Sequence, residues 1–354
     1  MPYNLFEKKE LKKFQTKEKK NWQEKNNTIY CDLRKTKLET PKNIDIDILE
    51  KLSNITRGLI FSAVESAKSG HPGSSSKVEE ILALLLGYTI AFDPINPKNP
   101  GRDRIVWSAG HSTPLIFSIN ALIYETLRRT GRQFSPAVVH SVLPEDLTRF
   151  RQIDGLPGHA EAHYPLVDYS TGPSGHGFSA AGGMAIAHKS SGLSTKIWVF
   201  MGDAETEEGM TYEARNILSA TGTDNIAVIL DYNHFGIDGE IEEVIDSSYI
   251  NHWQSMGWNI IEVDGHNFDE LINAYYLADK GLNNKKPTVI IAHTLKGKGY
   301  GKRENTAAAH GTPASHEEYL EIMKKLKFQI PGIIEETEKD IESIISTLKP
   351  EQEK

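Results

Sequence analysis

Residues 196–203 read KIWVFMGD, an apolar run that ends in a single acidic residue, Asp203. Runs of the same kind stand at 225–233 (NIAVILDYN) and 287–295 (PTVIIAHTL), and all are rich in β-branched residues, which favour strands. Helical patterns separate them, EEGMTYEARNILSATG at 207–222 and FDELINAYYLADK at 268–280. Fully apolar strands that alternate with helices predict an α/β fold, in which a parallel sheet is covered by helices on both faces.

Other helix boundaries are also marked in the sequence. Asn267 can serve as the N-cap of the helix at 268–280, and Glu270 completes the pattern of a capping box. Upstream, apolar residues recur at helical spacing over 46–63 and stop at the breaker SGHPG, residues 69–73. A second apolar helix is expected over 78–88.

The composition limits the class of protein. The 354 residues are 38% hydrophobic and 25% charged, which is enough for a large core, and the formal net charge of −8 argues against a general nucleic-acid binder. The single cysteine, Cys31, excludes an internal disulfide, and there is no run of about 18 apolar residues that could span a membrane. We therefore expect a cytoplasmic protein with no nucleic-acid and no membrane partner.

Three regions are expected along the chain. Residues 1–44 are expected to form a charged N-terminal arm. Its first 27 residues are rich in lysine and glutamate and predict a solvated or loosely helical segment, or one that docks on a partner subunit. Residues 45–320 carry the alternating pattern and form the main domain. Residues 321–354 predict a charged, helical C-terminal tail.

Asp203 and Asn233 end two successive predicted strands. Because the carboxyl ends of parallel strands open on one crevice, these side chains are expected to lie close together. One carboxylate and one amide oxygen, with waters and a backbone carbonyl, suit Mg²⁺ or Ca²⁺. The helix after Asp203 directs its positive N-terminal end to the same place, which favours phosphate. The structural alternative, in which Asp203 only caps this helix and Asn233 only makes a turn, is also open for this pair.

A longer set of motifs favours the functional interpretation. Gly202-Asp203, followed by Asn233, resembles the diphosphate-binding signature of thiamine-diphosphate enzymes. From about residue 50 to about residue 320, a series of motifs is similar to transketolase in content and order: SGHPGSSS (69–76), WSAGHSTPLIFS (107–118), LPGHAE (156–161), STGPSGHG (170–177), MGDAETEEG (201–209), LDYNHFGIDG (230–239), VDGHNF (263–268) and AAAHGTP (307–313). This resemblance implies a thiamine-diphosphate-binding fold, thiamine diphosphate with Mg²⁺ or Ca²⁺ as cofactors, and transfer of a two-carbon ketol unit from a ketose to an aldose.

The resemblance also implies roles for single residues. The metal would be held by Asp203, the side-chain oxygen of Asn233 and the backbone carbonyl of Phe235. The N–H of Ala204 and the imidazole of His111 would contact the diphosphate, and Gly202 would also belong to the cofactor-binding residues. The cofactor rings would lie along the backbone of Gly172, Pro173 and Ser174.

Two positions depart from the family's pattern. The usual Gly-Asp-Gly is Gly202-Asp203-Ala204 here, and the added methyl group predicts weaker but not abolished cofactor binding. The usual Gly-Gln-Gly is Gly175-His176-Gly177, so the contact that the glutamine makes in the family is in doubt.

Four histidines stand beside glycines in breaker-rich loops: His71, His111, His159 and His310. A neutral imidazole can accept or return a proton near the working pH, which cleavage between hydroxyl-bearing carbons requires. The resemblance implies that His71 and His310 act on the departing and incoming aldehyde and that His310 also belongs to the cofactor-binding residues. It implies that His159 binds a hydroxyl of the transferred unit. His234 has no such role and is expected to be structural.

The resemblance further predicts a partner. In the family, a glutamate on a second, homologous domain activates the cofactor, a third domain follows, and too few residues remain here after about residue 320 for either. We therefore expect the diphosphate-binding subunit of a split transketolase that is inactive alone. A second polypeptide would supply the pyrimidine-binding and C-terminal domains, including that glutamate and the arginines for sugar phosphates, in a dimer of heterodimers. Glu208 and Glu213 fall where the family links paired cofactor sites through carboxylates, but plain helix-surface roles are equally open.

Two other functions are compatible with the sequence. RFRQIDG at 149–155 resembles the single-chain bacterial decarboxylating component of 2-oxo acid dehydrogenases, although that chemistry needs no histidine set for sugar hydroxyls. Ala204 and the N-terminal arm would also suit a non-catalytic assembly subunit. The sequence does not identify the ketose donor or the aldose acceptor.

Overall fold

The computed structural model describes residues 22–25, 27–36, 38, 44–88, 90–245, 247–282 and 284–326. The predicted tail therefore lies outside the described residues from position 327 onward, as does the predicted arm up to residue 21.

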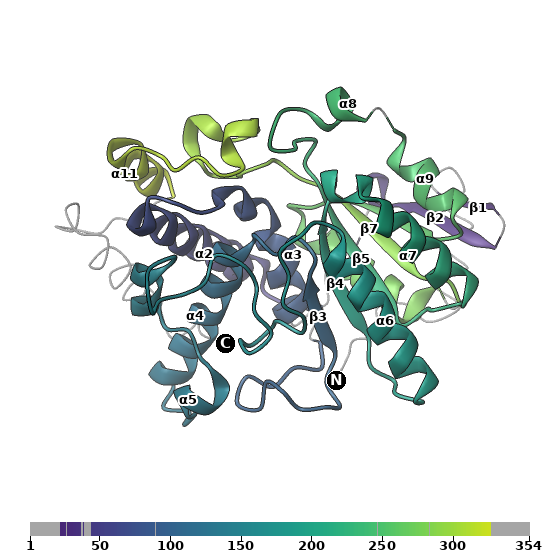
Figure 1. Ribbon diagram of the computed structural model, residues 1–354, viewed down its shortest axis with the longest axis horizontal. Coiled ribbons are helices and arrows are strands. Elements are labelled where there is room, and N and C mark those ends of the chain that lie inside the picture. The colour runs from purple at the N-terminus through teal and green to yellow at the C-terminus, as the bar shows by residue number, and fades with distance from the viewer. Residues whose placement is uncertain are drawn as a thin grey trace.

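A seven-stranded sheet in the order β1-β2-β6-β7-β5-β4-β3 forms the centre of the molecule (Figure 1). Its strands are β1 (Trp22–Lys25), β2 (Thr28–Asp32), β3 (Arg104–Trp107), β4 (Ile197–Gly202), β5 (Ile226–Tyr232), β6 (Asn259–Asp264) and β7 (Thr288–His293). Neighbouring strands are parallel except β1 and β2, which pair antiparallel. The predicted α/β fold with a parallel sheet is confirmed.

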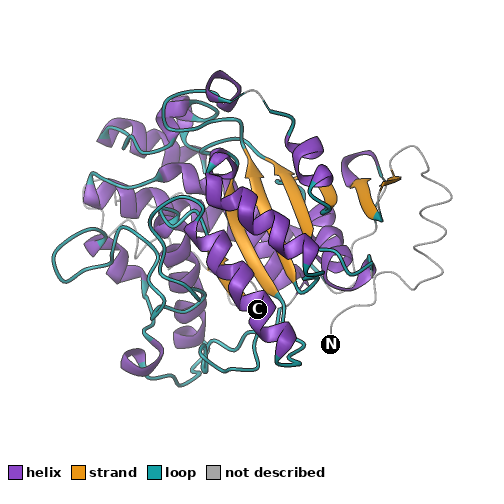
Figure 2. Cartoon of the chain, turned by 45° about the vertical axis from the view of Figure 1, so that its right-hand side comes forward, coloured by secondary structure: helices purple, strands orange, loops and turns teal. Residues whose placement is uncertain are grey.

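Helices cover both faces of this sheet (Figure 2). The α-helices of the described residues are α2 (Ile46–Ala67), α3 (Val78–Leu82), α4 (Thr113–Arg129), α5 (Pro136–Val139), α6 (His176–Ser190), α7 (Gly209–Ala220), α8 (Ile241–Val244), α9 (Tyr249–Ser255), α10 (Phe268–Tyr276) and α11 (His316–Lys325). None of the helices in the described ranges is both long enough and apolar enough to cross a bilayer.

The sheet separates two hydrophobic cores. Trp198 and Phe200 of β4 pack into the core shared with α2, α3, α4 and α10, whereas Ile197 and Val199 pack into the core shared with α6, α7 and α9. All four side chains are fully buried. Burial of each large apolar side chain contributes roughly 1.5–3 kcal/mol, so strands that are apolar on both faces are stable only between two helical layers.

The sheet extends beyond the predicted strands. β3 and β6 were not expected, and β2 joins β6 from within the region predicted to be an arm. Within the predicted arm, Trp22–Lys25 and Thr28–Asp32 are strands and not helix, and Cys31 and Leu33 are fully buried in the core beside β6. A long-range strand pairing of this kind leaves no local signal in the sequence.

The predicted helix starts are largely reproduced. Asn267 caps α10, because its Oδ1 accepts the N–H of Glu270 at 3.2 Å. The Glu270 carboxylate accepts the N–H of Asp264 at 2.6 Å instead of returning to Asn267, so only half of the capping box forms. The breaker at 69–73 ends α2 and leads through a 3-10 helix at Pro72–Lys77 into α3.

Candidate functional site

The candidate site begins where β4 and β5 end side by side. Asp203 follows β4, and its Oδ2 accepts the backbone N–H groups of Asn233 at 2.9 Å and His234 at 2.7 Å, both of which follow β5. The two strand ends therefore share one crevice, as their parallel order predicts. The His234 side chain is turned away to Glu242, at 3.0 Å, so this residue serves the site only through its backbone.

The Asp203 carboxyl group is buried without a full counter-charge. Burial raises its pKa to about 6, and the neighbouring Asp231 adds to this, although N–H groups and Lys296 oppose it. A bound cation would favour the ionised form of this group. Asp203 also accepts the N–H of Ala204 at 2.8 Å, which is the group expected to reach a diphosphate.

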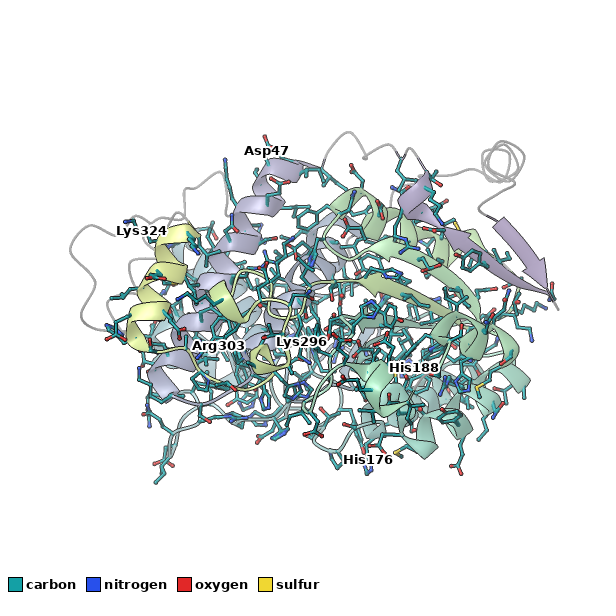
Figure 3. All side chains as sticks on the ribbon, turned by 90° about the horizontal axis from the view of Figure 1, so that it is seen from above. Asp47, His176, His188, Lys296, Arg303 and Lys324 are labelled. Atoms are coloured by element: carbon teal, nitrogen blue, oxygen red, sulfur yellow. The ribbon has the colours of Figure 1, made fainter. Side chains whose placement is uncertain are left out.

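The other two expected metal ligands lie close by. Asn233 Oδ1 accepts the N–H of Phe235 at 3.1 Å, and both residues line the same pocket as Asp203. The Phe235 carbonyl accepts a hydrogen bond from the Lys296 ammonium group, which also donates to Gly236 O at 3.1 Å. Lys296 lies in the interior of the molecule (Figure 3) and is only 5% exposed.

This pocket has a volume of about 500 Å³. Most of the residues expected at the cofactor line it: His111, Ser174, Gly202, Asp203, Ala204, Asn233, Phe235 and His310. Gly172 and Pro173 are exposed and do not line it, and His159 is exposed as well. Hard oxygen donors beside a buried carboxyl group fit Mg²⁺ or Ca²⁺ with a diphosphate, because these ions prefer oxygen ligands. Within the described ranges no three His, Cys, Asp or Glu side chains are grouped to hold a metal, so the candidate ligands are one carboxylate, one amide and one carbonyl.

Three of the four predicted histidines form a cluster, in which His111 and His310 line this pocket and His71 packs against both of them. The ring centroids of His71 and His111 are 4.8 Å apart, those of His71 and His310 5.3 Å, and those of His111 and His310 5.1 Å. Burial is the main reason that the pKa of His71 falls to about 4 and that of His310 to about 3, and it also holds the pKa of His111 well below its usual value. These imidazoles are therefore neutral near pH 7 and can take part in proton transfer or donate hydrogen bonds.

A buried ion pair in the wall of the pocket was not predicted. Lys77 Nζ lies 2.6 Å from Asp231 Oδ2, and both side chains are buried. Ser76 and Thr294 also donate hydroxyl hydrogen bonds to Asp231. Burial opposes the charge on Asp231, but Lys77 outweighs it and lowers the pKa of this carboxyl group. Lys77 and Lys296 both line the pocket, so two ammonium groups stand among its acidic side chains, and Lys77 is paired with Asp231.

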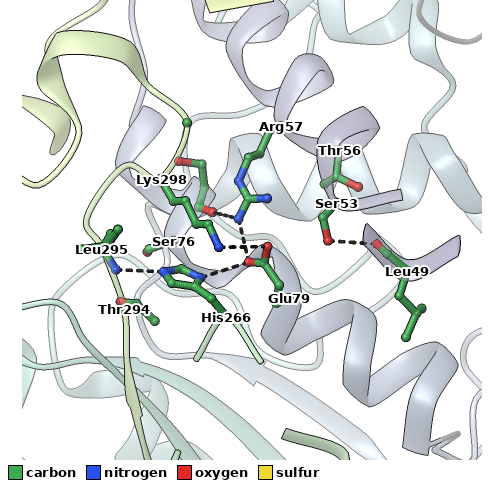
Figure 4. Close-up of polar contacts among 12 residues, drawn as sticks. Leu49, Ser53, Thr56, Arg57, Ser76, Glu79, His266, Thr294, Leu295 and Lys298 are labelled. Carbon is green, nitrogen blue, oxygen red and sulfur yellow. Dashed lines mark hydrogen bonds and ion pairs between the residues drawn. The ribbon is translucent and has the colours of Figure 1, made fainter. Parts of the chain in front are cut away.

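A second buried network connects two loops of the site (Figure 4). Glu79 accepts from Arg57 Nη2 at 2.6 Å and lies 3.2 Å from His266 Nδ1. The other ring nitrogen of His266 accepts the N–H of Leu295 at 2.9 Å, and Arg57 also donates to Ser75 O at 3.3 Å. The network therefore fixes the loop that carries His71 relative to the loop that carries Lys296.

Glu205 organises the remaining wall of the pocket. Its carboxylate accepts the N–H of Gly175 at 2.8 Å and that of Gly202 at 3.1 Å, together with the Ser108 hydroxyl. Glu208, which precedes α7, is exposed at the pocket, and Glu213 is exposed on α7.

The class of protein follows from the sheet and the position of its pocket: this is an α/β domain of the thiamine-diphosphate-binding kind. Residues 48–344 match the family described as transketolase, thiamine diphosphate binding domain. The chain therefore belongs to the transketolase family.

Solved structures agree with this assignment. A transketolase from Campylobacter jejuni superposes with a TM-score of 0.71 at 29% identity, covering 86% of this chain and 47% of that one. A transketolase from Leishmania mexicana superposes with a TM-score of 0.70 at 26% identity, covering 86% of this chain and 45% of that one.

Relatives of two lengths match the chain. It is 32% identical to a transketolase of Buchnera aphidicola over 80% of this chain, but spans only 42% of that relative. By contrast, it spans 96% of the 6-deoxy-6-sulfo-D-fructose transketolase subunit SqwG of Clostridium sp., at 31% identity over 79% of this chain. It also spans 99% of an apulose-4-phosphate transketolase subunit of Phocaeicola vulgatus, at 32% identity over 83% of this chain.

Proposed function

We propose that this chain is the diphosphate-binding subunit of a two-chain transketolase, which transfers a two-carbon ketol unit from a ketose to an aldose. The observation that carries the proposal is one pocket that combines Asp203, Asn233 and the Phe235 carbonyl with neutral histidines. The near-complete overlap with two proteins named as transketolase subunits supports the two-chain assembly.

In this proposal Asp203, Asn233 Oδ1 and the Phe235 carbonyl would hold Mg²⁺ or Ca²⁺, and this ion would neutralise the diphosphate of thiamine diphosphate. When bound, thiamine diphosphate supplies the electron sink for carbon–carbon bond cleavage. The Phe235 carbonyl accepts a hydrogen bond from Lys296 in this chain, so metal binding at this carbonyl would require the ammonium group to release it, and Lys296 would then be available for a phosphate oxygen. The neutral imidazoles of His71, His111 and His310 would bind oxygen atoms of cofactor and sugar, and those of His111 and His310 would hold or move the hydroxyl proton. Three expected binding residues are exposed in this chain: Gly172, Pro173 and His159. In the proposal, the partner subunit would cover the pocket, and these residues would then contact the cofactor and the sugar.

The partner is a second polypeptide that carries the pyrimidine-binding and C-terminal domains of the family, in a dimer of heterodimers. The two relatives that this chain spans almost completely are named for sugars that carry a sulfonate and a phosphate, which supports an anionic ketose as the donor here. The 2-oxo acid dehydrogenase alternative gains no support from the reported relatives, which are all named as transketolases or transketolase subunits.

The test is to purify the chain alone and with its candidate partner, and to assay ketose plus aldose against 2-oxo acid plus an electron acceptor. The proposal expects ketol transfer only by the pair, dependent on thiamine diphosphate and a divalent ion. Turnover by this chain alone, or turnover of 2-oxo acids by the pair, would contradict it. Asp203→Asn is the matched inactive control, because it keeps the shape of the side chain and removes its charge.

A further inference from the structure

Two motifs that are far apart in the sequence meet at the histidine cluster. Arg151 belongs to RFRQIDG, the motif that had suggested a different enzyme, and His71 belongs to the breaker SGHPG. Arg151 Nη2 lies 3.2 Å from His71 Nδ1, and Arg151 Nη1 donates to Ser69 Oγ at 2.8 Å. The guanidinium group therefore spans two residues of the loop between α2 and α3.

The loop that carries Arg151 is built to hold the guanidinium group in this place. Arg151 has a left-handed backbone, with φ of 56°, and its N–H donates to Leu156 O at 2.8 Å. Its guanidinium carbon lies 5.6 Å from the centre of the Phe150 ring. Gly158 leaves room for it, because a β-carbon there would lie 2.8 Å from Arg151 Nε.

This contact determines which nitrogen of His71 carries the proton. An arginine side chain stays protonated in proteins and can only donate, so the ring nitrogen that faces it must accept. Nδ1 of His71 is that nitrogen, and the proton of the neutral ring is then on Nε2. A proton added at Nδ1 would point at the N–H of Arg151. Burial first, and then the charges of Arg151, His159 and Lys296, hold the pKa of His71 at about 4, in agreement with a neutral ring.

We propose that Arg151 is a positioning residue that fixes His71 as the neutral tautomer with its proton on Nε2. In this form His71 donates a hydrogen bond from Nε2 and cannot accept a proton there. The Nε2 edge lies beside the segment of His310, since a β-carbon at Gly311 would be 3.8 Å from Nε2. The acceptor is an oxygen atom in the pocket, on the diphosphate or on the sugar. Only the identity of this oxygen acceptor rests on the proposed function.

The tautomer can be measured on the full chain without any turnover. Nitrogen–proton correlation spectra of the ¹⁵N-histidine-labelled chain, with His71 assigned from His71→Gln, should show Nε2 protonated and Nδ1 unprotonated near pH 7. In Arg151→Met the signals should move to an average of the two tautomers, whereas Arg149→Met should leave them unchanged, because Arg149 donates to Ile153 O instead. A proton on Nδ1 in the wild-type chain, or an unchanged spectrum in Arg151→Met, would overturn the proposal. If Arg151→Met does not fold, the wild-type spectrum alone still shows which nitrogen of His71 carries the proton.

A second measurement on the assembled enzyme identifies the acceptor. Arg151→Met should raise either the Kd of thiamine diphosphate or the KM of the ketose by about 2- to 12-fold, the value of one neutral hydrogen bond. The first result places the acceptor on the diphosphate and the second places it on the sugar. In a His71→Gln background, where an amide near the position of Nε2 donates without help, Arg151→Met should have little further effect. No change in either constant, or full additivity of the two substitutions, would contradict the positioning role.

Discussion

The pair of Arg57 and Glu79 gives the sharpest prediction about stability. Their side chains are 4% and 5% exposed, and Arg57 Nη2 lies 2.6 Å from Glu79 Oε2. Glu79→Gln keeps the shape of the side chain, removes the charge and leaves the Arg57 guanidinium group without a full partner. We expect this single change to destabilise the chain strongly and to loosen both site loops that the network joins.

The magnitude follows from the electrostatics of the carboxyl group. Burial alone would raise the pKa of Glu79, but Arg57 and the hydrogen bond with His266 outweigh burial and hold the pKa at about 2, against an ordinary value of 4.5. A difference of this size corresponds to about 3 kcal/mol at neutral pH. Removal of one partner of a buried ion pair costs about 3–5 kcal/mol in other proteins, which agrees. Because the folded-state pKa is depressed, this stabilisation is complete above pH 4.5 and is lost as the pH falls through about 2.

Urea unfolding of the full chain at pH 7 measures the loss. The matched control is Glu145→Gln, which breaks an exposed pair: Arg128 Nη1 lies 2.7 Å from Glu145 Oε1, with side chains 46% and 47% exposed. Exposed pairs contribute about 0–1 kcal/mol, so the control should change the free energy of unfolding by no more than that. Equal losses for Glu79→Gln and Glu145→Gln would refute the reasoning, as would a loss for Glu79→Gln that stayed constant below pH 4.5.

Three further predictions follow from the packing and charge of the site. Burial holds the pKa of His71 at about 4, below its usual 6.5, so the wild-type chain should lose stability as the pH falls from 6.5 to 4. His71→Gln should lose less stability over this range, and the melting temperature measured against pH checks both expectations. Gly177→Ala should lower the free energy of unfolding, measured in urea, by roughly 1–3 kcal/mol, because the added β-carbon would lie 2.5 Å from Ser108 Cα. Gly183→Ala on the same helix is the control: its β-carbon would meet nothing within 4 Å, so the change should be neutral or stabilising. Ala204→Gly should tighten thiamine diphosphate binding by less than about tenfold in calorimetry, and weaker binding would show that the methyl group is not an intrusion.

The central strands were predictable because their signal is local. β4, β5 and β7 are short apolar runs rich in β-branched residues, and they are fully buried along most of their length. β6 escaped prediction because Glu262 interrupts its apolar run. This carboxylate is 2% exposed and is satisfied by Arg34, His293 and Tyr30, which come from distant parts of the chain.

The candidate site was predictable in part for the same reason. Asp203 and Asn233 stand at the ends of predicted strands, so the parallel order alone brings them together. Lys77 and Lys296 were not predicted, because a lysine in a sequence usually indicates solvent exposure, and only the folded chain shows that both are buried beside acidic groups. The contact between Arg151 and His71 joins two loops that have no sequence relation.

The most direct test of the account is calorimetric titration of thiamine diphosphate into the chain assembled with its partner, with and without Mg²⁺, for the wild type and for Asp203→Asn. We predict saturable binding that requires the divalent ion, and a loss of at least about tenfold in affinity for the variant, since a charged ligand to the metal is removed. Binding of equal strength by the wild type and Asp203→Asn, with the same response to Mg²⁺, would contradict a metal-held diphosphate at the ends of β4 and β5.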